Sequence, residues 1–340
     1  MMAVYYAAGA LVWVLARRER HRVRPLAHGE TWLRYLCTAI VSAAAVWMAF
    51  DLPSRLQSAG DGRLRITFLD VGQGDAALVI FPRGSTLLVD AGGLPGTTTF
   101  DIGDRVVGPV LRHAGVRRLD VIALTHGDAD HAGGAATVLR EFQPADVWEG
   151  IPVPPHPLLA RLHAAAVSSH VRWANVQRSD SWDIDGVQLQ VHHPALPDWE
   201  RQRVRNDDSI VLELRWGEVS VVLTGDIGRD VEDTIATRMA PARLRVLKVP
   251  HHGSNSSSSE PFVRALAPDV AIISVGRANT FGHPAPSVLD RYAAVHASVF
   301  RTDRDGAVTV STDGTALRVD TFLGRTLELK PRKHDGHEYP

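Results

Sequence analysis

Four potential metal ligands lie within six residues at the end of an apolar segment: His126, Asp128, Asp130 and His131. Residues 119–125 before them are apolar and rich in β-branched side chains, which predicts a buried strand. Residues 132–140 after them resemble the start of a helix. The four ligands therefore fall on a strand-to-helix loop, where several side chains can turn toward one point. Crowding carboxylates and imidazoles there without a cation would cost stability, so we expect a bound metal.

Other apolar segments also end at residues that suit a metal site. Residues 219–223 lead to Asp226, and residues 244–249 lead to His251. Residues 85–89 lead to Asp90, which we expect to accept a hydrogen bond from a ligand histidine. Predicted strands alternate with single helices in two similar halves. This order predicts an α/β (α+β) fold in which two sheets pack face to face with helices outside.

Several other residues near these segments stay open to more than one interpretation. His192 and His193 follow a predicted strand and are either additional ligands or ordinary strand-end residues. His283 could hold a phosphate oxygen or protonate a leaving group, or it is a loop residue without a chemical role. The run of serines at 256–259 predicts a flexible loop. Lys248 could favour an anionic substrate, but we expect an isolated basic residue to be solvated.

Composition limits the chemistry of the site. The chain has 340 residues, a net charge of -1 and a single cysteine, Cys37. An internal disulfide and a thiolate zinc site are therefore excluded, and metal ligands must be His, Asp or Glu. Three Asp and three His ligands predict one or two divalent ions, either Zn²⁺ or Mn²⁺. The near-zero net charge gives no global argument for binding nucleic acid.

The first 53 residues differ in character from the rest. Residues 3–16 and 35–52 are apolar, and an 18-residue helix rises about 27 Å, close to the thickness of a bilayer core. Arginines concentrate between the two segments. Since positive loops stay cytoplasmic, we expect about two transmembrane helices with the remainder of the chain outside the cytoplasmic membrane. A signal peptide or a buried hairpin is the alternative. The predicted boundaries are 1–53 for the membrane segment, 54–63 for a linker, 64–328 for the main domain and 329–340 for a disordered tail.

The pattern from His126 to His131 is similar to the HxHxDH signature of the metallo-β-lactamase superfamily. Asp128 stands where that signature usually has its second histidine. The variant HxDxDH, with other motifs in the same order, resembles the C-terminal hydrolase domain of ComEC-type DNA-internalisation proteins of natural competence. Those motifs are FLDVGQGDA (68–76), VDAG (89–92), NDDS (206–209), LTGD (223–226), VPHHGS (249–254) and FGHP (281–284).

The resemblance implies a metallo-β-lactamase-like αββα sandwich and assigns a role to each candidate residue. His126 and Asp128 would bind one ion, and Asp130, His131 and His251 a second ion. Asp226 would bridge the two ions. Asp130 would also accept a proton from the attacking water, with His283 as the other catalytic candidate. The residues expected to support the ligands without binding metal are Asp75, Asp90 and His252.

The resemblance also implies a metal-dependent hydrolase, namely a phosphodiesterase or nuclease that acts on DNA during uptake. Expected partners are DNA, the membrane and a multi-span DNA channel protein or region, of which this chain would be a fragment or shortened form. The hydrolase domain would lie on the extracytoplasmic side of the cell membrane. Two alternatives stay open: a membrane-tethered, non-catalytic module that binds DNA or supports the channel, and a phosphodiesterase for a cell-envelope substrate other than nucleic acid.

Overall fold

The computed structural model describes most of the chain from residue 60 onward and a short segment before it, namely residues 35–42, 60–94, 100–151, 154–196 and 206–331. The chain divides into two units, Met1–Gln57 and Ser58–Pro340. In the first unit, residues 35–42 are helical. Among the described residues, no helix combines the length and the apolar character needed to cross a bilayer. The remainder of the predicted membrane segment, most of the predicted linker and residues 332–340 of the predicted tail lie outside the described residues.

A nine-stranded sheet contains the first six strands and the last three. Its order is β16-β15-β14-β1-β2-β3-β4-β5-β6. Strands β3 to β6 are parallel to one another, whereas the other neighbours are antiparallel. The strands are β1 (Leu64–Phe68), β2 (Ala77–Ile80), β3 (Thr86–Val89), β4 (Val121–Leu124), β5 (Asp146–Glu149), β6 (Arg172–Asn175), β14 (Val308–Thr312), β15 (Leu317–Thr321) and β16 (Thr326–Leu329).

A seven-stranded sheet contains the strands between these two groups. Its order is β13-β12-β11-β10-β9-β8-β7, and strands β10 to β13 are parallel. The strands are β7 (Ser181–Ile184), β8 (Val187–His193), β9 (Val211–Trp216), β10 (Val219–Leu223), β11 (Leu244–Lys248), β12 (Val270–Ile273) and β13 (Ser298–Arg301). Because β16 ends at Leu329, that residue belongs to the sheet and not to the predicted tail.

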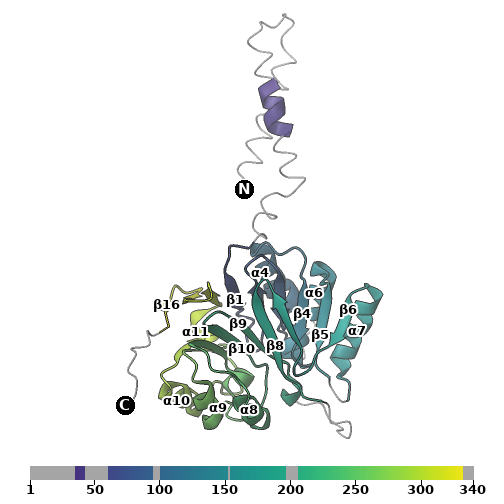
Figure 1. Cartoon of the computed structure of the whole chain (residues 1–340). Coiled ribbons are helices and arrows are strands. Elements are labelled where there is room, and N and C mark those ends of the chain that lie inside the picture. Colours follow the sequence, from purple (N-terminus) through teal and green to yellow (C-terminus); the bar gives the residue numbers. More distant parts are fainter. Residues whose placement is uncertain (1–34, 43–59, 95–99, 152–153, 197–205, 332–340) are drawn as a thin grey trace, which may run out of the picture. The chain divides into compact units, whose positions relative to one another are not determined.

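The two sheets pack face to face around one apolar core, to which Ile66 and Val79 of the first sheet and Leu212 and Val246 of the second contribute. Helices cover the outer face of each sheet through a further apolar cluster. The first sheet carries the π-helix η1 (Gly103–Val107), α4 (Gly108–His113), α6 (Ala135–Phe142) and α7 (Pro157–Ser168). The second carries α8 (Arg229–Ala236), α9 (Glu260–Leu266) and α10 (Pro286–Ala294) (Figure 1). This αββα sandwich confirms the predicted arrangement of sheets and helices.

The serine run before α9 is a folded part of the molecule. Ser257 and Ser258 are fully buried, and Oγ of Ser257 donates a hydrogen bond to the carbonyl oxygen of Pro250 at 2.9 Å. The backbone amides of Ser258 and Ser259 donate to the buried carboxylate of Glu232. The prediction of a flexible loop was therefore wrong. The segment is ordered because the buried carboxylate of Glu232, from α8, accepts hydrogen bonds from the backbone amides at the start of α9.

Parallel pairing brings the chemically important loops to one edge. β3 is parallel to β4 in one sheet, and β10 is parallel to β11 in the other. Asp90 follows β3, and the loop with His126 follows β4 and leads into the short helix α5 (Ala129–Ala132). Asp226 follows β10, and the turn η3 (Pro250–Gly253) follows β11. Because the carboxyl ends of parallel strands share an edge, the loops that carry Asp90, His126, Asp226 and His252 follow strands that end at this edge.

Candidate metal centre

Four buried residues form a candidate metal site at this edge: Asp75, His131, Asp226 and His252. One potential ligand atom of each lies within 4.8 Å of those of the other three. Oδ2 of Asp226 lies 3.3 Å from Nε2 of His131 and 3.4 Å from Nε2 of His252. Asp75, on the loop before β2, and His131, in α5, belong to the side of the first sheet, whereas Asp226 and His252 follow strands of the second. The site therefore joins the two halves of the sandwich.

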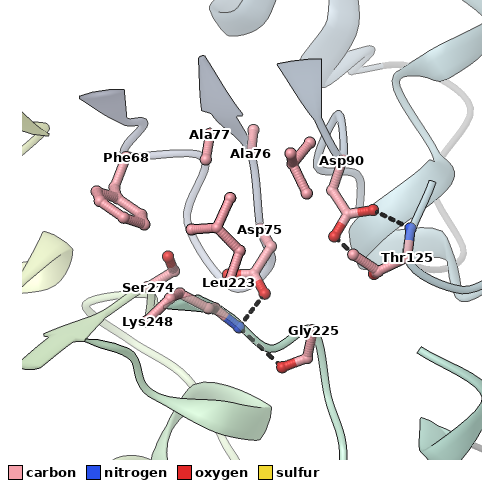
Figure 2. Close-up of a pocket in the computed structure, with 11 residues that line it drawn as sticks. Phe68, Asp75, Ala76, Ala77, Asp90, Thr125, Leu223, Gly225, Lys248 and Ser274 are labelled. Carbon is pink, nitrogen blue, oxygen red and sulfur yellow. Dashed lines mark hydrogen bonds and ion pairs between the residues drawn. The ribbon is translucent and has the colours of Figure 1, made fainter. Parts of the chain in front are cut away.

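Hydrogen bonds fix the orientation of both histidines. Nδ1 of His131 donates to Oδ2 of Asp90 at 2.8 Å, and Nδ1 of His252 donates to the carbonyl oxygen of Ser274 at 2.9 Å. With the proton on Nδ1, each neutral imidazole presents the lone pair of Nε2 to the cluster. Asp90 is itself held by the backbone amide and hydroxyl of Thr125, at 2.8 and 2.7 Å (Figure 2).

Several buried atoms in and beside the cluster have no hydrogen-bond partner among the described residues. They include Nε2 of His126, His131 and His252, Oδ1 of Asp226 and both carboxylate oxygens of Asp75. A buried polar atom without a partner costs about 1–3 kcal/mol, and native proteins contain few of them. Imidazole nitrogen and carboxylate oxygen are ligands for zinc and other divalent transition metals. The residues present therefore fit a divalent cation.

The shifted pKa values of the cluster residues also indicate that the site suits a cation. Burial disfavours the charged form of His252, but the negative charges of Asp226 and Asp75 outweigh it and raise the pKa of His252 to about 10. Burial also opposes the charge on His131, yet Asp226 and Asp90 raise the pKa of His131 well above its usual value. Burial disfavours the carboxylate of Asp226, but His252 and His131 hold its pKa well below the usual range. The cluster thus stabilises positive charge at its centre.

Lys248 is a residue of this site that sequence reasoning placed wrongly on the surface. Its side chain is buried, forms an ion pair with Asp75 and donates to the carbonyl oxygen of Gly225 at 3.1 Å (Figure 2). Burial disfavours its charge, but Asp75 and Asp226 outweigh that cost and raise the pKa of Lys248. Asp75 approaches Nδ1 of His131 at 3.7 Å and Nδ1 of His252 at 3.9 Å, the nitrogens that already donate elsewhere. Asp75 therefore lies with Lys248 behind the atoms that face Asp226.

The adjacent histidines of η3 have different environments. His252 is buried in the cluster, whereas the side chain of His251 is 28% exposed and its Nε2 lies 3.9 Å from Oδ2 of Asp226. The side-chain amide of Asn206 donates to Nε2 of His251 at 3.3 Å. The buried cluster therefore contains His252, whereas His251, which the sequence predicted as a ligand, lies at its edge. Both residues have left-handed backbone conformations, with φ of 49° and 52°, so the chain turns sharply between them.

A second group of side chains lies beside the cluster. The ring of His126 lies 4.1 Å from that of His131, and its Nε2 lies 3.6 Å from Oδ2 of Asp128. His156 approaches the other oxygen of Asp128 at 3.7 Å. Its Nδ1 accepts a hydrogen bond from the amide of Leu158, so its Nε2 carries the proton and faces Asp128.

His156 was missed by the sequence analysis because it precedes a helix instead of ending a strand. Its ring fills the space beside Gly127. A Cβ atom on Gly127 would lie 2.2 Å from Cγ of His156, so only glycine permits this approach.

The other predicted residues lie at the rim or elsewhere. Oδ2 of Asp130 lies 3.5 Å from Nε2 of His252, so Asp130 reaches the edge of the cluster. His283 is half-buried, and its ring lies 6.1 Å from that of His251. Nε2 of His192 donates to Glu213 at 2.8 Å and Nε2 of His193 to the carbonyl oxygen of Asp207 at 2.7 Å. Among the described residues, these two histidines lie outside the candidate site.

A cavity of about 570 Å³ adjoins the cluster. Asp226 and His251 line it on the side of the candidate site, and Asn206, Arg229 and Asn255 contribute other parts of its wall. Nη2 of Arg229 donates to the backbone oxygen of Asn255 at 2.8 Å, which fixes the guanidinium there. The wall offers a ligand the positive charge of Arg229 and amide donors, together with the carboxylates of Asp207, Asp226 and Asp230, whose charge a bound cation would offset.

An αββα sandwich with a buried His and Asp site at the shared edge of its sheets defines a class of metal-dependent hydrolases. The sequence profile of the metallo-beta-lactamase superfamily matches residues 69–277, and the chain belongs to this superfamily. It is 30% identical to ComE operon protein 3 of Bacillus subtilis over 80% of this chain and 35% of that protein. It is 31% identical to competence protein ComA of Neisseria gonorrhoeae over 78% of this chain and 35% of that protein.

These competence proteins confirm the resemblance to the ComEC-type family. The chain spans about a third of the length of these curated relatives. Among solved structures, CmlA, a diiron beta-hydroxylase from Streptomyces venezuelae, has a TM-score of 0.47 and 17% identity. That match covers 78% of this chain and 54% of the other.

Proposed function

We propose that the protein is a metal-dependent phosphodiesterase that hydrolyses DNA during its uptake. The observation that carries the proposal is the convergence of Nε2 of His131, Nε2 of His252 and the carboxylate of Asp226 in a buried position, where both nitrogens and Oδ1 of Asp226 lack a hydrogen-bond partner. This position borders a cavity that suits a phosphodiester. The relatives named for competence support DNA as the substrate.

The candidate ligands divide into two groups. His131, His252, Asp226 and Asp130 would hold one divalent ion, Zn²⁺ or Mn²⁺, while His126 and Asp128 would contribute to a second. In this assignment His252 takes the role predicted for His251. When bound, such ions would acidify a water molecule and stabilise the charge that develops on phosphoryl oxygens.

The protein's own residues supply proton transfer and substrate positioning. Burial disfavours the charge on Asp130, but His252 and His131 outweigh it and lower the pKa of Asp130. Asp130 is therefore ionised at neutral pH and can accept a proton at the rim of the site. Burial and the neighbouring His251 lower the pKa of His283, so this imidazole is neutral. A neutral His283 can donate an N–H to a phosphoryl oxygen, and Arg229 can bind the adjacent phosphate.

The location of the protein belongs to the same proposal. The two apolar N-terminal segments with arginines between them would anchor the chain in the cell membrane. The hydrolase domain would then act on the extracytoplasmic side, beside a multi-span DNA channel. A protease added to intact cells should cleave the domain if this orientation is correct, whereas protection of the domain would contradict it.

A nuclease assay on the full chain tests the proposed reaction. We expect cleavage of single- or double-stranded DNA with Mn²⁺ or Zn²⁺, and loss of cleavage on addition of a chelator. Asp226→Asn should abolish the reaction, and Asp320→Asn on strand β15 is the matched control. Cleavage that survives Asp226→Asn would exclude the site. DNA binding without cleavage of any phosphodiester would favour the non-catalytic module, and cleavage only of other phosphodiesters would favour an envelope substrate.

A further inference from the structure

An exposed aromatic side chain lies beside the candidate site. Phe281 belongs to the loop between β12 and α10 and is 66% exposed. Its ring lies almost parallel to that of His283, with 5.8 Å between centroids and an angle of 19° between planes. His283 in turn lies 6.1 Å from His251, which lines the cavity next to Asp226. Two ring contacts therefore connect Phe281 with that cavity.

Hydrogen bonds hold this loop in a defined conformation. The side-chain amide of Asn279 donates to the carbonyl oxygens of Gly276 and His283, both at 2.9 Å. The backbone amide of His283 donates to Oδ1 of Asn279 at 2.9 Å. The amide of Gly276 donates to Oε1 of Gln73 at 3.2 Å, which ties the loop to the other sheet. The phenyl ring is thus presented to solvent from a fixed support.

The phenyl ring of Phe281 is exposed next to a polar cavity, and this combination indicates the class of ligand that could contact both. The cavity wall provides Arg229 and amide donors, which suit phosphate, beside the carboxylates of Asp207, Asp226 and Asp230. A ligand with a charged linkage and a flat aromatic group can bind the cavity wall with the linkage and contact Phe281 with the aromatic group. A nucleotide has this composition, and its base can stack on an aromatic side chain whatever the base identity.

We propose that Phe281 forms a stacking platform for a nucleobase next to the scissile phosphate, which makes single-stranded nucleic acid the preferred substrate. This inference rests on the proposed phosphodiesterase function. In a duplex, both faces of each base are covered by neighbouring bases, so an unpaired strand is needed to offer a base to the ring. His283 backs Phe281 on one side, and the base would occupy the exposed side.

The test compares a single-stranded DNA of about ten nucleotides with an abasic oligomer of the same length. The abasic strand keeps the phosphodiesters but lacks every base. For the full-chain protein with Mn²⁺, we expect kcat/KM to be about tenfold higher on the base-containing strand. Phe281→Ala should remove this difference by lowering only the value for the base-containing strand, and Phe281→Trp should retain it. Phe322→Ala, at an 81% exposed position between β15 and β16, is the control.

The outcomes separate the two proposals. Suppose that the wild type cleaves both strands and that Phe281→Ala either lowers kcat/KM equally for the two strands or changes it for neither. The stacking platform is then wrong, while the phosphodiesterase function stands. Equal cleavage of single strands and duplexes by the wild type would also overturn the platform. If the wild type cleaves no strand with any divalent metal, the proposed function fails and the platform fails with it. Thermal unfolding of each variant verifies that the fold is retained.

Discussion

Nζ of Lys248 lies 3.7 Å from Oδ1 of Asp226 and forms an ion pair with Asp75, so a buried ammonium borders the candidate metal ligands. Its charge offsets part of the repulsion between the carboxylates. It does so independently of any metal, and it fixes Asp75 behind the two histidines. Lys248 therefore acts as a positioning residue for the site.

Replacing Lys248 should destabilise the protein. Lys248→Met leaves Asp75 buried without its cation, which typically costs about 3–5 kcal/mol of the free energy of unfolding. Urea denaturation of the metal-free protein measures this loss. Lys330→Met, at an exposed position, should have little effect. An unchanged unfolding free energy in Lys248→Met would show that the ion pair contributes nothing.

Metal binding should release protons. The raised pKa values of His131 and His252 mean that both are protonated at neutral pH without metal, yet a ligand nitrogen must be deprotonated. We expect release of about two protons near pH 7 and an affinity that rises with pH. Titration calorimetry in buffers of different ionisation enthalpy measures the number. His252→Gln should release fewer protons, and a wild-type heat independent of the buffer would contradict the prediction.

The same groups give the metal-free protein a defined pH dependence. The pKa of His252 is raised from 6.5 to about 10 on folding. Its contribution to stability is therefore fully present below pH 6.5 and is lost as the pH rises through 10. Thermal unfolding of chelator-treated protein between pH 6 and pH 10 should show this loss, and the loss should be smaller in His252→Gln.

Arg229 should contribute to substrate binding without taking part in proton transfer. Removal of one charged hydrogen bond to phosphate typically lowers kcat/KM by roughly ten- to a hundredfold. We expect Arg229→Ala to raise KM for a phosphodiester substrate more than it lowers kcat, and Arg229→Lys to recover part of the loss. Arg238→Ala, at an exposed position after the same helix, is the control. An unchanged KM in Arg229→Ala would place the phosphate elsewhere.

Glu213 lies outside the candidate site, and its carboxylate should contribute to the free energy of unfolding. Burial disfavours its charge, but hydrogen bonds from His192, Ser220 and Arg215 lower its pKa from 4.5 to about 2. Its contribution, about 3 kcal/mol, is present above pH 4.5 and is lost as the pH falls through 2. Urea denaturation at pH 6 and pH 3 should show a smaller difference for Glu213→Gln than for the wild type. Equal differences would mean that the carboxylate gains no stability on folding.

Much of the fold could be predicted from sequence because it depends on local patterns. Segments of four or five residues with mostly apolar side chains define the strands at residues 121–124, 219–223 and 244–248. Each ends at a residue that can bind metal, and parallel pairing brings these ends together. The helices α7 and α9 were not predicted, although each carries a proline in its first turn, which is a helix-start signal.

The details of the candidate site depend on three-dimensional relations that a local pattern does not contain. Lys248 lies on β11, which is buried throughout, whereas a lysine in the sequence alone predicts an exposed position. The left-handed backbone at residues 251 and 252 decides which histidine enters the cluster. His156 reaches Asp128 from another element, through space that Gly127 leaves free. Each of these features arises only when distant segments pack.

The candidate ligands come from both sheets, with His131 on one side of the sandwich and Asp226 and His252 on the other. An ion held by all three would act as a cross-link between the N-terminal and C-terminal halves of the domain. Removal of that ion would then loosen the contact between the halves as well as stop chemistry. Amide hydrogen exchange at this edge of both sheets should accelerate together when a chelator is added.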